Sequence, residues 1–285
     1  MNLPSPSAAE QRRLPAQLRH AHLVDAARRR GFFLVADISA ELGVSEMTIR
    51  RDLVELEREG ILLRTRGGAV AAGSAVPAVL DREEPAFEVR LRKNQEAKQR
   101  IAAAAADLIE GRRTVALDVG TTTHLLARRL AERAGLKFFT ASLRTAALLG
   151  EAGCEVHVPG GQVRGEELSA CGPTALEQFE RYWFDIAFIG VSGICADGMF
   201  DYSLEDSALK RVYLRRSAQK VLLCDGSKFH RRSLVQIADF GGIDLMISEA
   251  EPPPDIAAAL ASAGVQVRIA PFIGIGMADR QPFPS

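Results

Sequence analysis

The chain has 285 residues, and its 36 lysines and arginines balance its 36 aspartates and glutamates, so that its formal net charge is zero at pH 7. This length allows a small module followed by a larger domain with its own core. Zero net charge excludes a uniformly basic nucleic-acid-binding protein, and any basic surface must therefore be local.

The cysteines and the apolar segments exclude several further classes. The four cysteines are widely spaced and form no C-x-x-C pair, and the histidines are not clustered, which argues against a zinc site or a disulfide framework. We therefore expect reduced thiols, no metal and no cofactor. Because no apolar run has the length of a signal-peptide core or a membrane span, we expect a cytoplasmic protein without a membrane segment.

The first part of the chain predicts a tail and then helices. Residues 1–15 are rich in Pro, Ser and Ala and are predicted to be a disordered tail, whereas residues 18–30 have helical apolar spacing. Residues 35–60 predict two short amphipathic helices, with Gly43 at the sharp turn between them. Gly60 is placed to end the second helix.

The second of these two helices combines an apolar face with a polar one. Ser45 suits its N-cap, and its inward positions recur at i, i+4 and i+7, at Ile49, Leu53 and Leu56. In a helix-turn-helix the first residues of the second helix reach base edges in the major groove of double-stranded DNA. Arginine can bind guanine or a phosphate group. We predict that Arg51 contacts a base and that Arg50 contacts either a base or a phosphate.

Residues 61–70 predict a small basic wing of two strands around a Gly-Gly turn. An ordinary helical hairpin with solvated charges is the alternative, because charged residues alternate on any surface helix. The predicted DNA-binding residues in this winged helix-turn-helix domain, residues 16–72, are Ser45, Met47, Thr48, Arg50, Arg51, Arg64 and Arg66.

The rest of the sequence predicts a linker at residues 73–86 and then an α/β domain. A long helical pattern runs from Phe87 to Gly111, and seven near-continuous apolar runs then alternate with helical stretches up to residue 270. Apolar runs of this kind are typical of strands buried on both faces, and their alternation with helices predicts a mostly parallel sheet. Residues 271–285 are predicted to be a second tail.

Polar residues follow the ends of five successive predicted strands. Ligands of parallel sheets bind at these strand ends, and glycine, hydroxyl and cationic groups there suit an anionic, hydroxyl-rich small molecule. Taken alone, the first of these segments could be a strand-to-helix turn with hydroxyl caps, and Arg164 and Lys228 could be solvated charges. The predicted effector-binding residues at these ends are Asp118, Gly120, Thr121, Thr122, Thr123, Thr140, Ser142, Gly160, Gly161, Arg164, Gly193, Asp225, Ser227 and Lys228.

Both parts resemble one protein family. The run from Leu42 to Leu53, continued by Leu56, Gly60 and residues 66–69, closely resembles the DNA-binding domain of the DeoR family of bacterial transcription regulators. Residues from about 84 to 249 resemble the sensor domain of that family, whose fold looks like that of ribose-5-phosphate isomerase. The matching residues include Arg90, Asn94, Lys98, Asp118, Gly120, Gly172, Glu205, Lys210 and Asp225.

The resemblance implies that a phosphorylated sugar, or a metabolite derived from one, binds the sensor domain, and it adds Glu205 and Lys210 to the expected effector site. This chain departs from the family pattern at Val119, Ala141, Phe200, Asp201 and His230, which predicts an unusual effector.

We therefore expect a repressor of carbohydrate or related catabolic genes that is not an enzyme and forms a dimer or tetramer. The competing hypothesis is a sugar-phosphate isomerase-like enzyme that carries a DNA-binding head, and a third is a C-terminal half that only oligomerises.

Overall fold

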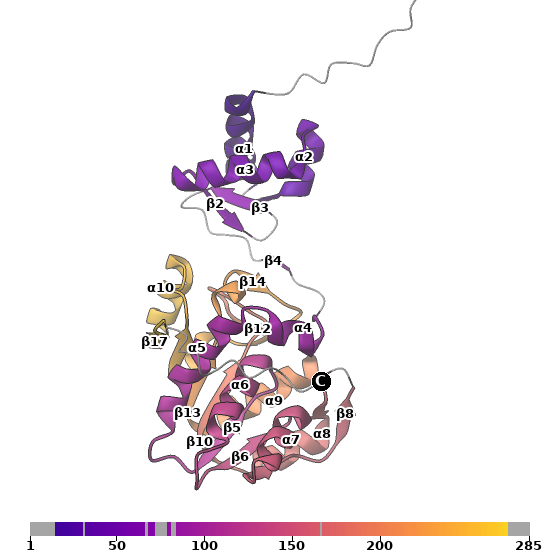
Figure 1. Ribbon diagram of the computed structural model, residues 1–285, viewed down its shortest axis with the longest axis vertical. Coiled ribbons are helices and arrows are strands. Elements are labelled where there is room, and N and C mark those ends of the chain that lie inside the picture. The colour runs from indigo at the N-terminus through magenta and orange to yellow at the C-terminus, as the bar shows by residue number, and fades with distance from the viewer. Residues whose placement is uncertain are drawn as a thin grey trace, which may run out of the picture. The chain divides into compact units, whose positions relative to one another are not determined.

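The computed structural model describes residues 15–30, 32–65, 68–71, 79–80, 84–165 and 167–272, and it divides into two compact units, residues 1–77 and 78–285 (Figure 1). Both predicted tails, 1–15 and 271–285, lie almost entirely outside the described residues, as does most of the predicted linker, residues 73–86. Each unit has a core of its own.

The first unit is a winged helix-turn-helix, as predicted. Its three strands form an antiparallel sheet in the order β1-β3-β2. The strand β1 has no counterpart in the sequence prediction, and it pairs with the returning strand of the wing. The elements are α1 (Ala16–Arg30), β1 (Phe32–Leu34), α2 (Val35–Leu42), α3 (Glu46–Arg58), β2 (Leu62–Thr65) and β3 (Gly68–Ala71).

Local sequence explains the turn and the orientation of α3. Gly43 adopts a left-handed φ of 62° between α2 and α3, a conformation that favours glycine. Ser45 caps α3 by accepting a hydrogen bond from the Thr48 amide at 3.2 Å. The predicted inward positions Ile49, Leu53 and Leu56 are all buried. The period of α3 therefore fixes which face remains outside.

A buried ion pair joins α1 to α3. Asp52 is 5% exposed, and its two carboxylate oxygens accept hydrogen bonds from Arg19 Nε at 2.7 Å and Arg19 Nη2 at 2.8 Å. The hydrogen bond to Asp52 raises the pKa of Arg19. Arg19 therefore links α1 to α3 within this unit.

The second unit contains a seven-stranded parallel sheet in the order β17-β16-β13-β10-β5-β6-β7. Its strands correspond to the seven apolar runs, which confirms the predicted α/β class. The sheet strands are β5 (Thr114–Leu117), β6 (Lys137–Thr140), β7 (Glu155–His157), β10 (Phe184–Gly190), β13 (Ser217–Leu223), β16 (Leu245–Ser248) and β17 (Gln266–Ile269).

Helices cover both faces of this sheet. Side chains from α5, α6 and α7 pack on one face with residues such as Val115 and Leu117, whereas those of α8, α9 and α10 pack on the other with residues such as Ala116. The alternation along β5 is that of a strand buried on both faces. The helices are α5 (Gln95–Ala106), α6 (Thr121–Leu130), α7 (Leu143–Glu151), α8 (Pro173–Glu180), α9 (Leu204–Arg215) and α10 (Pro254–Ser262).

The prediction of a single helix from Phe87 to Gly111 was wrong, because the helix is interrupted at Asn94. Asn94 has a φ of 54°, which separates α4 (Phe87–Arg92) from α5, and the chain continues into the short helix η1 (Asp107–Ile109). The Asn94 side chain donates to Asp225 Oδ1 at 2.9 Å. Asparagine tolerates the left-handed conformation, and its distant partner is invisible to local periodicity.

Short strands and turns complete the second unit. They form the small sheets β11-β12-β15, β8-β9 and β4-β14, so that part of the predicted linker pairs within this unit. The elements are β4 (Val79–Leu80), β8 (Gln162–Arg164), β9 (Ser169–Cys171), β11 (Gly193–Cys195), β12 (Gly198–Asp201), η2 (Gly226–Lys228), β14 (Arg231–Arg232), β15 (Val235–Ala238) and η3 (Phe240–Gly242).

Replacing Asp52 by Asn should destabilise the first unit by about 1–3 kcal/mol, because Arg19 would lose a charged partner within a largely buried contact. Amide hydrogen exchange of α3 in the full-length protein measures this loss of protection. Arg50→Ala, which removes an exposed pair with Glu46, should change it by less than about 0.5 kcal/mol and serves as the control. Equal effects of the two substitutions would contradict the role given to Asp52.

Candidate functional site

The N-terminal end of α3 presents an exposed polar face. Met47 is 61% exposed, and Arg50 and Arg51 are exposed on the same helix. Arg50 forms an i,i+4 ion pair with Glu46 at 3.1 Å, which a phosphate could replace. Ser45 and Thr48 are engaged in the helix cap, where their hydroxyl oxygens lie 2.9 Å apart. Arg51 is exposed near the start of the same helix, and its contact with a base stays a sequence prediction.

The wing contributes less to the described surface. Arg64 lies in β2, opposite Ala69 of β3, and its side chain is outside the described part of the chain. Arg66 lies outside the described residues altogether. Their assignment to phosphate contacts therefore remains a sequence prediction.

A pocket lies in the second unit, at the carboxyl ends of three adjacent strands, β13, β10 and β5. Leu223, Gly190 and Val119 line it at these three strand ends, and the first turn of α6 forms another wall. This is the edge at which parallel sheets bind ligands.

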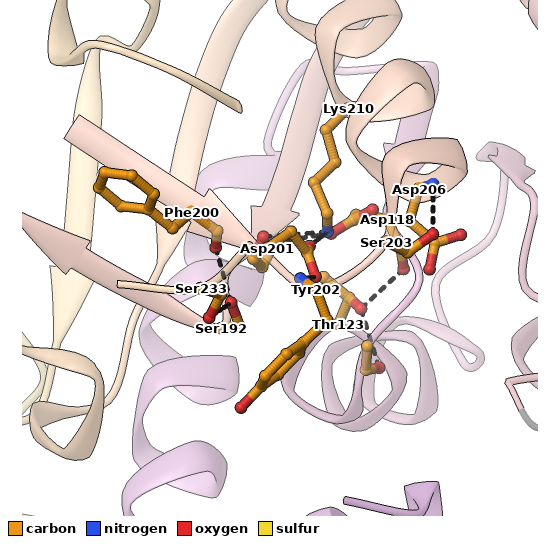
Figure 2. Close-up of polar contacts among 12 residues, drawn as sticks. Asp118, Thr123, Ser192, Phe200, Asp201, Tyr202, Ser203, Asp206, Lys210 and Ser233 are labelled. Atoms are coloured by element: carbon orange, nitrogen blue, oxygen red, sulfur yellow. Dashed lines mark hydrogen bonds and ion pairs between the residues drawn. The ribbon is translucent and has the colours of Figure 1, made fainter. Parts of the chain in front are cut away.

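Lys210 occupies the inner wall of the pocket, and Figure 2 shows it extending from α9 between Asp118 and Asp201. It is 1% exposed, and its Nζ contacts Asp118 Oδ2, Asp201 Oδ2 at 3.1 Å and the Gly190 carbonyl at 3.1 Å. Burial opposes the charge of Lys210, but Asp118 and Asp201 outweigh it and raise its pKa. The ammonium group is therefore charged and fully engaged.

Burial perturbs the Asp118 carboxyl group even though it contacts Lys210. It is 1% exposed and also accepts a hydrogen bond from the Gly190 amide at 2.9 Å. Burial raises the pKa of Asp118 to about 6, with Lys210 opposing the shift. Two carboxylates share one ammonium here, so the inner wall carries more acid than base.

The N-terminus of α6 offers groups suited to an anion. No side chain caps this helix at Gly120, and the Thr123 hydroxyl donates to the carbonyls of Asp118 at 2.8 Å and Gly120 at 3.0 Å. Free backbone N–H groups at a helix start and the helix dipole attract anions. Lys98 and Lys228 line the same pocket, and burial lowers the pKa of Lys98 to about 8.

The pocket thus gathers part of the predicted site. It brings together residues from the ends of β5, from α9 and from the segment that follows β13. The predicted Asp118 does not line the pocket itself but contacts Lys210, which does. The predicted residues that line the pocket are Gly120, Thr121, Thr122, Thr123, Lys210, Asp225 and Lys228.

The other predicted residues have structural contacts instead. Thr140 accepts from the Ser142 amide at 3.1 Å, and Ser142 caps α7. Thr140 ends β6 and Ser142 follows it, whereas the pocket lies over β5, β10 and β13. The predicted residues that do not line this pocket are Thr140, Ser142, Gly160, Gly161, Arg164, Gly193, Glu205 and Ser227.

Two of the glycines among these residues, Gly161 and Gly193, allow close backbone approach. A Cβ at Gly161 would lie 2.5 Å from the Cys171 carbonyl, and one at Gly193 would lie 2.3 Å from the Arg231 carbonyl. Such distances are impossible for a real side chain, so these glycines permit the packing of β8-β9 and of β11 on β14. Packing therefore accounts for glycine at these two positions, and their role in effector binding stays a prediction.

Several polar residues that line the pocket were not among the predicted effector-binding residues. The sequence carried a signal for some of them: Lys98 is a lysine on the alanine-rich face of α5 and is only 4% exposed, and Arg90, like Lys98, matches the sensor-domain family pattern. The contribution of Glu84, Tyr202 and Asp206 depends on tertiary structure. The omitted polar residues are Glu84, Arg90, Lys98, Ser192, Asp201, Tyr202 and Asp206.

Comparison with known proteins identifies the family. Residues 93–250 match the model of the DeoR C terminal sensor domain, and residues 19–75 match that of the DeoR-like helix-turn-helix domain. The chain belongs to the DeoR family. The sensor-domain match includes the pocket residues from Lys98 to Lys228.

Relatives in this family align over nearly the whole chain. The chain is 36% identical to the HTH-type transcriptional regulator GlpR of Haloferax volcanii, over 82% of this chain and 89% of that protein. It is 31% identical to the HTH-type transcriptional repressor GlcR of Bacillus subtilis, over 87% and 93%. The glycerol-3-phosphate regulon repressor of Escherichia coli is 27% identical, over 88% and 98%.

Among solved structures, ribose 5-phosphate isomerase A of Methanocaldococcus jannaschii covers 48% of this chain and 55% of its own, with 17% identity and a TM-score of 0.37. A likeness this weak carries no inference about chemistry. In the described part of the chain, no helix is long and apolar enough to cross a membrane. No group of three or more acidic, His or Cys residues among the described residues could hold a metal ion.

The raised pKa of Asp118 gives a signed prediction. The folded protein binds this proton more tightly than the unfolded chain, so ionisation of Asp118 between about pH 4 and pH 6 should lower the free energy of unfolding, by at most about 3 kcal/mol. Asp118→Asn should remove this part of the pH dependence, while Asp201 still pairs with Lys210. Urea unfolding across this pH range measures the difference, and identical slopes in both proteins would contradict the assignment.

Proposed function

We propose that this chain represses transcription of genes for the catabolism of sugars or related compounds, and that a phosphorylated sugar or a derived metabolite controls it. The observation that carries the proposal is that one chain combines an exposed, arginine-bearing α3 N-terminus with a separate polar pocket. Membership of the DeoR family and the names of its relatives, which include repressors, support the same function.

The pocket suggests how such an effector binds. Its phosphate group would lie at the N-terminus of α6, where backbone N–H groups, Lys98 and Lys228 supply donors and positive charge. Its hydroxyl groups would donate to carboxylates such as Asp201 and Asp225 on the neighbouring walls. The apolar lining is small, so recognition rests on hydrogen bonds and charge.

Control of DNA binding follows from differential affinity. An effector that prefers one arrangement of the sensor domain shifts the population of DNA-binding states, and coupling of about 1–3 kcal/mol changes operator affinity roughly 5- to 150-fold. We propose a dimer or tetramer, because symmetric oligomers place two recognition helices on repeated half-sites.

Arg51→Ala should weaken binding to a specific duplex by about 1–3 kcal/mol and reduce discrimination against random DNA. The test duplex is one that the full-length protein selects from a random pool, and binding is measured by fluorescence anisotropy. Arg58→Ala is the matched control, because it removes the same charge from the exposed far end of α3. If Arg51→Ala retained full sequence preference, another residue would read the bases.

Sugar phosphates should raise the melting temperature of the protein, because a ligand that binds only the folded state adds about 2.7 kcal/mol at a hundredfold excess over Kd. A thermal-shift screen of phosphorylated sugars and their unphosphorylated counterparts measures this effect. Lys228→Met should lose the shift, whereas Lys137→Met, at the opposite end of the sheet, should retain it. A shift of equal size in both variants would exclude Lys228 from the site.

A further inference from the structure

Glu84 lies at the start of the sensor domain and also lines the pocket. It lies within the predicted linker, residues 73–86, and inside the second unit, and its side chain is only 16% exposed. Its two carboxylate oxygens face two arginines from separate elements, Arg90 Nη1 of α4 at 3.0 Å and Arg164 Nη1 of β8 at 3.5 Å. A residue that leads toward the DNA-binding unit is therefore part of the pocket wall.

Arg90 holds this segment by its backbone as well as by its side chain. Its Nε donates to the Pro85 carbonyl at 2.9 Å, and its Nη2 pairs with Glu167. Arg90 itself lines the pocket. One guanidinium group therefore contacts the pocket space and two consecutive residues of the entering chain.

The entering chain has a second attachment near the pocket. Strand β4 pairs in parallel with β14, through Val79 with Arg231 and Leu80 with Arg232. β14 follows the segment from Asp225 to Lys228, which contributes two residues to the pocket lining. The entering chain is therefore attached beside the pocket at residues 79–80 and again at residues 84–85.

The ion pairs of Glu84 are poised to be broken by an anion. Burial raises the pKa of Glu84 to about 7, and Glu167 and Asp201 add to this shift while Arg90 and Arg164 oppose it. An anion that enters the pocket repels Glu84 and offers Arg90 a new bidentate partner, since guanidinium binds phosphate oxygens in this way.

We propose that Glu84 couples the pocket to the DNA-binding unit: an anionic effector competes with its carboxylate for Arg90 and releases residues 84–86 from the pocket wall. This inference rests on the proposed function, because it requires an anionic ligand in the pocket. Glu84 acts as a positioning residue, since it transmits occupancy of the pocket and is not needed to bind the ligand.

Hydrogen-exchange mass spectrometry of the full-length protein, with inorganic phosphate as the probe, tests the coupling. Phosphate is titrated until the melting temperature stops rising, and exchange is then followed in peptides that cover residues 84–92. In the wild type, phosphate should speed exchange of this segment by at least about fivefold. Glu84→Gln, which removes the charge and keeps the size, should exchange fast without phosphate and gain little from it.

Glu88→Gln is the matched control. Glu88 lies in α4, within the same peptides as Glu84, but it is exposed and pairs with Arg144 rather than with a pocket residue, so this variant should behave like the wild type. Glu84→Gln should also retain the phosphate-induced rise in melting temperature. That rise shows that the variant is folded and that its pocket still binds the anion.

The outcomes separate the coupling from the proposed function. If phosphate raised the melting temperature of the wild type but left exchange of residues 84–92 unchanged or slowed it, the coupling would be wrong and the anion site would stand. If phosphate and sugar phosphates produced no rise in any variant, both would fail. Equal exchange responses in Glu84→Gln and the wild type would also overturn the role of Glu84.

Discussion

The buried ammonium group of Lys210 is the contact on which the sensor domain depends. It joins α9 to the ends of β5, β10 and β12 through Asp118, the Gly190 carbonyl and Asp201. Without that cation, two buried carboxylates would lose their shared partner, at a cost of several kcal/mol. The pocket therefore exists because these strand ends converge on one charge, and its acid-rich inner wall is a direct consequence.

Ion pairs with shared partners also occur elsewhere around the pocket. Arg164 pairs with Asp206 and Glu84, and Arg90 pairs with Glu84 and Glu167, so each arginine serves two acids. A network in which partners are shared responds as a unit when one charge is added, because each ion must then find a new partner. A binding site built in this way is suited to a sensor. The network includes Glu84, which lies near the start of the second unit.

Much of the fold could be predicted because its causes are local. The i, i+4, i+7 spacing of Ile49, Leu53 and Leu56 set the buried face of α3, and Gly43 and Ser45 set its start. The apolar runs likewise predicted the seven sheet strands, but the expected burial on both faces was wrong for the edge strands β7 and β17, whose residues are intermediate or exposed. The break at Asn94 was missed, because the Asp225 carboxylate that receives its amide is 131 residues away in sequence.

The candidate site was likewise predicted only where its causes are local in the sequence. By itself, the sequence determined a winged helix-turn-helix, an α/β sensor and polar strand ends, because periodicity and turn chemistry act over a few residues. Tertiary structure decided which of those ends share a pocket, since the strand order places β13, β10 and β5 side by side and leaves Gly160 beyond β6. It also decided that Glu84, Arg90 and Asp201 line the pocket, because long-range charge pairing brings them there.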